Sequence, residues 1–271
     1  MKYIDTILLG IIQGLSEFLP ISSSAHLMIF RDIFGIGKFI VDDLEMCFDI
    51  SLHLGTLLAI LIYFFRDFVR MFLRGIIKGP KDKEGKLLYY VIVATIPAAI
   101  LGLLFDDIVE SYFRTNYLLI IVALVVMGIL LYIFDIKKED TNSLKKMTWL
   151  DAILIGLAQC LALIPGFSRS GTTITMARIR KINRVDAAKF SFYLSFPVTL
   201  GAVVLKFIKG DMMNLILYDK TVFIIGVTTS FIIGLIVIKF LLKFLDKHEY
   251  NIFMWYRLIL SMIILVTLYM R

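Results

Sequence analysis

Leu19-Pro20-Ile21-Ser22-Ser23-Ser24 ends an apolar segment at residues 4–21, and Ile164-Pro165-Gly166-Phe167-Ser168-Arg169-Ser170-Gly171 ends another at residues 150–165. A proline ends a helix, and hydroxyl residues after it favour the start of a new one. Non-helical backbone at membrane depth is tolerated only where protein covers it or a cavity lies beside it. Both segments therefore predict a re-entrant helical hairpin.

The composition places the whole chain in a membrane. Of its 271 residues, 59% are hydrophobic and 19% are charged, and the mean hydropathy is +0.87. A soluble domain has roughly 45–50% apolar and about 25% charged residues. Disorder, a collagen-like structure and an ordinary cytosolic enzyme are thereby excluded. Cys47 and Cys160 are too far apart to suggest a disulfide framework or a zinc site.

Six longer apolar runs each approach the roughly 20 residues that cross a bilayer. They lie at about 47–65, 88–105, 117–135, 190–208, 221–242 and 253–270. The sequence therefore predicts an all-α polytopic membrane protein, a single integral membrane domain over residues 1–271.

An internal repeat relates the two halves of this domain, residues 1–136 and 147–271. Gly10-Ile11-Ile12-Gln13-Gly14-Leu15 matches Gly156-Leu157-Ala158-Gln159-Cys160-Leu161, and the prolines of the two breaks then align after a one-residue gap. Each half comprises one re-entrant hairpin plus three transmembrane helices. Because three is odd, the repeat has inverted topology, and we expect the two hairpin tips to meet near mid-membrane.

The basic residues agree with this topology. If the 66–86 loop is inside, most of the 29 Lys and Arg residues fall in inside segments, as the positive-inside rule requires. Both termini are then outside, and the first hairpin enters from outside. The net charge of +7 is spread between apolar runs, which suits anionic lipid and not nucleic acid.

Polar residues at membrane depth are costly and usually functional. Gln13 and Glu17 share one helix face, because they are four residues apart. Ser23 and His26 lie within the first turn of the helix that follows the first break, and Arg169 lies at the second break. Helix N-termini and a guanidinium bind anions. These groups predict a buried site for a lipid phosphate, with phosphoryl transfer to a serine or to water.

Other interpretations remain open from the residues alone. Inverted repeats with broken helices are also typical of transporters, so a lipid flippase fits the same anion site. Such a flippase needs Arg169 but neither Ser23 nor His26. A passive structural protein leaves the buried charges unexplained. His53, four residues after Asp49, is equally compatible with lining a cavity and with a packed core.

The two breaks also resemble a known family. Residues 13–26, Gln-Gly-Leu-Ser-Glu-Phe-Leu-Pro-Ile-Ser-Ser-Ser-Ala-His, and residues 165–173, Pro-Gly-Phe-Ser-Arg-Ser-Gly-Thr-Thr, resemble the signature motifs of the undecaprenyl-diphosphate phosphatases, the bacitracin-resistance membrane proteins of the BacA type. The resemblance extends over the whole chain. It implies an enzyme that hydrolyses undecaprenyl diphosphate to undecaprenyl phosphate and phosphate. Such enzymes recycle the lipid carrier for peptidoglycan synthesis and confer bacitracin resistance.

The resemblance assigns four catalytic residues, Glu17, Ser23, His26 and Arg169. Seven more are implied in substrate binding: Gln13, Ser22, Ser24, Ser168, Ser170, Thr172 and Thr173. The family's first motif begins with Glu or Gln, and Gln13 leaves Glu17 as its one clear carboxylate. Ser23 is the expected nucleophile, and either His26 or Glu17 takes its proton.

The expected partners follow from the same interpretation. Similar enzymes are stimulated by divalent cations, so Mg²⁺ or Ca²⁺ at the diphosphate is implied, although no residue spacing identifies metal ligands. No organic cofactor and no nucleic acid are expected, and a homo-oligomer is compatible with the sequence. The resemblance implies a multi-pass protein of the bacterial plasma membrane. Because the first hairpin opens outward, we expect the active site to face the outer side.

Overall fold

The computed structural model describes residues 2–40, 42–108, 116–136, 142–209 and 211–270. These ranges are built from helices, with one isolated β-bridge between Asn142 and Ile182. The α-helices are α1 (Lys2–Ser16), α2 (Ser23–Asp32), α3 (Asp42–Tyr63), α4 (Phe65–Lys78), α5 (Gly85–Ile108), α6 (Tyr117–Ile136), α7 (Trp149–Gln159), α8 (Arg169–Ile179), α9 (Arg184–Ile208), α10 (Asp211–Tyr218), α11 (Lys220–Leu245) and α12 (Asn251–Met270). The all-α fold is confirmed.

Six described helices are long and apolar enough to cross a membrane. They cover Leu44–Tyr63, Gly85–Phe105, Tyr117–Ile136, Arg184–Ile208, Lys220–Leu245 and Asn251–Met270. Each of the six predicted runs falls in or largely overlaps one of them, so the polytopic membrane architecture is confirmed. The two shorter apolar segments form α1 and α7, which have 15 and 11 residues, fewer than the roughly 20 that cross a bilayer, and the predicted breaks follow them.

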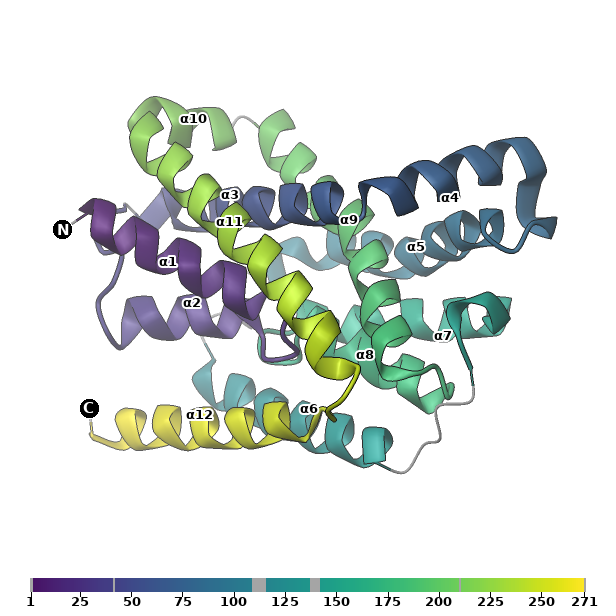
Figure 1. The fold of residues 1–271 in the computed structure, drawn as a ribbon. Coiled ribbons are helices and arrows are strands. Elements are labelled where there is room, and N and C mark those ends of the chain that lie inside the picture. The colour runs from purple at the N-terminus through teal and green to yellow at the C-terminus, as the bar shows by residue number, and fades with distance from the viewer. Residues whose placement is uncertain (1, 41, 109–115, 137–141, 210, 271) are drawn as a thin grey trace.

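The order of elements is the same in both halves. A pair of short helices separated by a break (α1–α2 and α7–α8) is followed by a long helix, a shorter helix and two long helices. Both chain ends lie at one end of the molecule, and the turn between α4 and α5 lies at the other (Figure 1). The inverted relation of the two halves stays a prediction.

The loop predicted at residues 66–86 is wrong over most of its length. Residues 65–78 form helix α4, which is followed by a short 3-10 helix at Gly79–Lys81 and a turn. The segment is amphipathic: its charged residues recur at helical spacing, while Phe65, Phe72 and Ile76 are exposed. Charge alone suggested a loop, but an apolar helix face can lie against lipid while the charged face remains polar.

The hairpin of each half packs against a long helix of the other half. Helix α1 of the first half packs on α11, and α7 of the second half packs on α5. Helix α3 lies against both α9 and α11. At Gly55, α3 approaches α11 so closely that a Cβ atom would overlap Ser230 Oγ and the carbonyl oxygen of Val227. The hairpins are therefore held inside the bundle, where their breaks are covered by protein.

Several basic residues that the sequence analysis placed in inside segments are structural. Asp135 is fully buried and accepts hydrogen bonds from Arg178 Nε at 2.9 Å, from Arg184 Nε at 2.8 Å and from the backbone N–H of Tyr250 at 2.9 Å. These bonds join α6, α8, α9 and the start of α12. Four residues of the charge comparison, Arg114, Lys137, Lys138 and Arg271, lie outside the described residues.

Candidate active site

Both hairpins break at a serine with left-handed backbone. The φ angle is 74° at Ser22 and 67° at Ser168, a region that is uncommon for residues other than glycine and persists only where the surroundings hold it. Helix α2 begins directly after Ser22, and α8 begins directly after Ser168. The Ser168 hydroxyl accepts a hydrogen bond from the N–H of Gly171 at 3.2 Å. Ser22 makes no such capping bond, so the two breaks share the left-handed serine and present two helix N-termini but differ in their caps.

The structure brings the two tips into direct contact. The N–H of Gly166 donates to Ser22 Oγ at 3.1 Å, and Ser170 Oγ donates to the carbonyl oxygen of Leu19 at 3.1 Å. Gly166 has a φ angle of 101°, and a Cβ there would collide with α6 at the carbonyl oxygen of Ile120. Residues about 150 positions apart in the sequence therefore form one polar junction.

A buried arginine from α12 completes this junction. The Arg257 side chain is fully buried. It donates to the carbonyl oxygens of Pro20 at 2.6 Å, Gly166 at 3.1 Å and Phe167 at 3.3 Å. Carbonyls in a helix break have no partner within the helix, and unsatisfied carbonyls in an apolar interior are costly. One guanidinium thus satisfies carbonyls of both breaks.

Glu17 is the centre of the candidate active site. Its Oε2 accepts a hydrogen bond from Ser23 Oγ at 2.8 Å. Its Oε1 pairs with Arg169 Nη2 from the other hairpin. The Glu17 side chain is about 5% exposed, so this carboxylate is shielded from solvent and held between a hydroxyl and a guanidinium. Three of the four predicted catalytic residues therefore meet.

Gln13 and His53 extend this cluster. Gln13 Nε2 donates to Glu17 Oε2 at 3.0 Å and lies 2.8 Å from His53 Nδ1. His53 Nδ1 is 3.2 Å from Glu17 Oε2. The Gln13 side chain thus bridges the carboxylate and the imidazole, as expected from two residues on one face of α1. The imidazole that contacts Glu17 belongs to α3 and not to the serine-rich motif.

A cavity of about 330 Å³ adjoins the cluster. Glu17, Ser23, His53 and Arg169 line it, together with the predicted binding residues Ser22, Ser24 and Ser168. Arg169 Nη1 is buried and has no hydrogen-bond partner among the described residues. A buried guanidinium N–H without an acceptor is a position where an anionic oxygen would bind.

His26 lies on the other side of α2, away from this cavity. Its Nδ1 donates to the carbonyl oxygen of Ser22 at 2.7 Å, which leaves Nε2 of a neutral ring as acceptor for the Tyr256 hydroxyl at 2.7 Å. The two rings are stacked, with centroids 5.6 Å apart. His26 therefore holds the left-handed Ser22 peptide in place and makes no hydrogen bond to Ser23 among the contacts found.

The remaining predicted hydroxyls stabilise the second break. Thr172 Oγ1 donates to the carbonyl oxygen of Arg169 at 3.0 Å, and Thr173 Oγ1 does so at 2.8 Å. Thr173 Oγ1 also lies 2.8 Å from Ser191 Oγ of α9. Ser170 bonds to the first hairpin, as described above. These three residues do not line the cavity and instead fix the start of α8.

The site contains no described set of side chains suited to hold a metal ion. Within the described ranges, no three or more His, Cys, Asp and Glu side chains lie close enough together to hold a metal ion. Both oxygens of Glu17 are bonded within the cluster. The other carboxylate of the cavity, Asp49, has Oδ1 2.5 Å from Arg31 Nη2. A resident Mg²⁺ or Ca²⁺ needs several free oxygen ligands, which these residues do not offer.

Two residues of the site could have been found in the sequence. Arg257 is the one charged residue within the apolar run 253–270, and a charge at that depth is itself a signal of function or structure. The sequence is equally compatible with His53 in a cavity wall and in a packed core, and the structure places it in the cavity wall. The sequence does not mark Tyr256 as a site residue, because tyrosine is common at membrane interfaces.

Fold and site define a multi-pass membrane protein in which two interrupted hairpins meet at a buried cluster of Glu17, Ser23 and Arg169. A sequence model of the family described as bacitracin resistance protein BacA matches residues 6–263. The chain is 44% identical over 271 residues to an undecaprenyl-diphosphatase of Caldicellulosiruptor bescii, covering 100% of this chain and 99% of the relative. It is 41% identical over 273 residues to one of Desulforudis audaxviator, with 100% of both chains covered. The chain belongs to the BacA family of bacitracin resistance proteins.

Proposed function

We infer that the chain is an undecaprenyl-diphosphatase, an integral membrane phosphatase that hydrolyses undecaprenyl diphosphate to undecaprenyl phosphate and phosphate. Two relatives that match the chain over almost their full length are named undecaprenyl-diphosphatase, and the family model is described as bacitracin resistance protein BacA; both findings support this activity. The activity recycles the lipid carrier for cell wall synthesis. Removal of the diphosphate form gives bacitracin resistance, which is the property that the family description names.

The observation that carries the proposed chemistry is the contact of Ser23, Glu17 and Arg169 across the two hairpins. A hydroxyl that donates to a buried carboxylate at 2.8 Å is placed for proton removal. A guanidinium with a free N–H beside it suits the oxygens of a phosphate. A lipid flippase would need the cation but gives no reason for the bonded serine.

In the first step, Ser23 Oγ attacks the terminal phosphorus and its proton passes to Glu17 Oε2. The bond from that phosphorus to the bridging oxygen breaks, and undecaprenyl phosphate leaves with the bridging oxygen. Arg169 Nη1 and the N-terminal N–H groups of α2 and α8 bind the phosphoryl oxygens. Phosphoryl transfer depends mainly on such positioning and charge stabilisation.

In the second step, water attacks the phosphorus of phosphorylated Ser23. The P–Oγ bond breaks, phosphate leaves, and the proton held by Glu17 returns to Oγ. His53 lines the same cavity and lies 3.2 Å from Glu17 Oε2, so in this proposal it takes one proton from the attacking water and then releases it to solvent. The proposed base is therefore Glu17 in the first step and His53 in the second.

His26 acts through the backbone in this proposal. It holds the Ser22 carbonyl, and Ser22 precedes the nucleophile directly. The bond from His26 to Tyr256 fixes the ring between α2 and α12. His26 is thus a positioning residue whose loss moves Ser23. Ser22, Ser24 and Ser168 line the cavity and are proposed to contact the diphosphate.

We propose that the cavity opens toward the outer side of the plasma membrane. Its lining residues on α3 and α9, among them Met46 and Ala202, belong to the halves of these helices nearer the chain ends, and both chain ends lie at one end of the molecule (Figure 1). The basic residues favour placing that end outside. The chain is proposed to be one membrane domain with inverted repeats at 1–136 and 147–271.

The direct test is phosphate release from a polyprenyl diphosphate by purified protein in detergent. Wild-type protein should release phosphate, and Ser23→Ala should lower the rate by at least about a thousandfold. Ser195→Ala is the matched control, since Ser195 is a buried serine of α9 outside the cavity. Equal rates in wild type and Ser23→Ala would remove the proposed nucleophile. Transport of the lipid without phosphate release would favour a flippase.

A further inference from the structure

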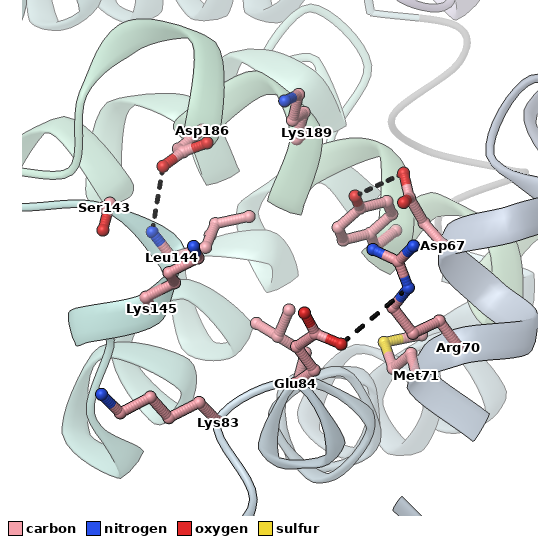
Figure 2. A pocket seen from close by; sticks show the side chains of 12 residues that line it. Asp67, Arg70, Met71, Lys83, Glu84, Ser143, Leu144, Lys145, Asp186 and Lys189 are labelled. Carbon is pink, nitrogen blue, oxygen red and sulfur yellow. Dashed lines mark hydrogen bonds and ion pairs between the residues drawn. The ribbon is translucent and has the colours of Figure 1, made fainter. Parts of the chain in front are cut away.

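A second polar cavity lies far from the Glu17 site, at the end of the molecule that carries the α4–α5 turn (Figure 1). Its volume is about 360 Å³, within the usual size of a ligand pocket. It is bounded by α4, the start of α5, the segment before α7 and the first turns of α9. Figure 2 shows the charged side chains around it. None of its lining residues belongs to the Glu17 cavity.

Two of the three acidic residues in this cavity are bonded to uncharged donors. Asp67 accepts a hydrogen bond from the Tyr193 hydroxyl at 3.1 Å. Asp186 accepts from the N–H of Leu144 at 3.0 Å and from Asn183 Nδ2 at 2.9 Å. The dashed lines of Figure 2 include the bonds to Asp67 and Asp186. These carboxylates have structural partners of their own.

The third acid, Glu84, is paired with arginines of α4. Its Oε2 lies 3.1 Å from Arg74 Nε and 3.9 Å from Arg70 Nε. Arg74 also pairs with Asp82 at 3.4 Å. Backbone N–H groups of Gly85 and Glu84 hold the pKa of Asp82 below its usual range, so Asp82 stays charged beside Arg74. The two arginines therefore neutralise Glu84 and Asp82, whereas Asp67 and Asp186 keep their negative charges.

Three lysines remain around the cavity: Lys83, Lys145 and Lys189. They come from three separate segments, the α4–α5 turn, the segment before α7 and the first turns of α9. No carboxylate of the described residues lies within ion-pairing distance of any of them. Lys189 is partly buried, so its charge is only partly compensated by water. The three lysines thus have no ion-pair partner among the described residues, and they outnumber the two lining carboxylates, Asp67 and Asp186, that no described cation pairs.

An apolar cavity adjoins this charged one. Its volume is about 590 Å³, and α4, α5 and the residues Phe196 and Pro197 of α9 line it. Met71 lines both cavities. Thr95 is the one polar residue of the apolar lining, and its hydroxyl is turned to the carbonyl oxygen of Val91 at 2.7 Å. A charged pocket and an apolar groove therefore share a boundary.

We propose that these two cavities together bind a lipid with a phosphate headgroup. The phosphate lies among Lys83, Lys145 and Lys189, and the hydrocarbon chain lies in the groove between α4, α5 and α9. Unpaired lysines beside an apolar groove match an anionic amphiphile, because they provide charge for the head and an apolar surface for the tail. The proposal does not depend on the phosphatase activity, since the two sites share no residue.

The first test measures the reactivity of individual lysines in the full-length protein. Purified protein in phosphatidylcholine nanodiscs is acetylated briefly, with and without 10% phosphatidic acid, and the sites are read by mass spectrometry. Phosphatidic acid should slow acetylation of Lys83, Lys145 and Lys189 at least about threefold relative to Lys243, an exposed lysine of α11. Equal slowing at all four, or at none, would overturn the proposal.

Inorganic phosphate forms the second arm of this test. It should protect the three lysines much less than phosphatidic acid at the same concentration, because it has no chain for the apolar groove. Equal protection by inorganic phosphate would show an anion site without a lipid and would overturn the lipid as occupant.

The third arm compares two triple variants of equal charge. Lys83→Gln, Lys145→Gln and Lys189→Gln together should weaken binding of phosphatidic acid, counted by native mass spectrometry, about tenfold or more. Lys239→Gln, Lys243→Gln and Lys247→Gln together should leave it unchanged. Phosphate release should persist in both, which separates this site from the proposed active site. Equal lipid binding by both triple variants would refute the assigned site. If a variant does not fold, the acetylation of the three lysines in wild-type protein decides between the proposal and its refutation.

Discussion

Arg169 of α8 and Glu17 of the first hairpin form an ion pair that joins the two halves of the chain. Glu17 also accepts a hydrogen bond from Ser23, so the same carboxylate connects the proposed nucleophile with the proposed phosphate ligand. A buried charge without its partner is strongly unfavourable. The pair therefore stabilises the junction of the hairpins and places the reacting groups.

Arg169 should be irreplaceable by lysine. A lysine keeps the charge but lacks the planar fork that contacts Glu17 through Nη2 and leaves Nη1 for a phosphate oxygen. We expect Arg169→Ala to lower kcat by about a hundredfold or more, and Arg169→Lys to recover only a small part. Phosphate release measures both. Arg66→Lys, at an exposed arginine of α4, is the control. Full activity of Arg169→Lys would contradict the proposal that Nη2 holds Glu17 while Nη1 binds the phosphate.

Replacing His53 and replacing His26 should affect activity and stability differently. His53 contacts the carboxylate of Glu17, so His53→Ala should lower kcat by roughly a hundredfold, the scale of general acid–base catalysis, with little change in melting temperature. If His53→Ala keeps the wild-type rate, the imidazole has no part in the proton transfer.

His26→Ala should lower the melting temperature as well as the rate. It removes the side-chain donor of the Ser22 carbonyl, which still accepts from the backbone N–H of residue 26 at 3.2 Å, and the acceptor of the exposed Tyr256. Each lost hydrogen bond costs about 0.5–1.5 kcal/mol. Tyr256→Phe, which removes only the hydroxyl, should reproduce a smaller part of both losses. A His26→Ala protein of wild-type stability without activity would instead indicate a direct catalytic role for His26.

Arg257 should be essential for folding of the junction. Arg257→Met keeps the length of the side chain but leaves three carbonyl oxygens of the two breaks without their donor, at about 1–3 kcal/mol for each unsatisfied group. We expect a large drop in melting temperature in detergent. Ser261→Ala, one turn later on α12, serves as the control, and an unchanged melting temperature of Arg257→Met would show that other donors reach these carbonyls.

Gly55 should tolerate no larger residue. In Gly55→Ala the new methyl group meets Ser230 and the backbone of α11, and overpacking of this kind costs about 1–3 kcal/mol. Gly201→Ala is the matched helical control, since no atom lies within 4 Å of its Cβ position. That variant should gain up to about 1 kcal/mol from helix propensity. Thermal unfolding compares the two, and equal effects would contradict the close approach of α3 and α11.

The amino-acid sequence by itself determined the class of protein and most of its elements. Long apolar runs have one stable environment, a bilayer, so the six spans could be read from residue type and length. The breaks at Pro20 and Pro165 were equally clear, because proline and serine act on the local backbone. The motif residues Glu17, Ser23 and Arg169 could be selected, since charges and hydroxyls at membrane depth are rare.

The tertiary structure alone decided which groups contact one another. Imidazoles occur at His26 and His53, and only the packing of α3 against α1 shows that His53 faces Glu17 while α12 engages His26. Arg257 lies far along the chain from both breaks, so its three carbonyl partners depend on the pairing of helices. Local sequence specifies where a helix begins and ends, whereas contacts between distant segments follow from how the helices pack.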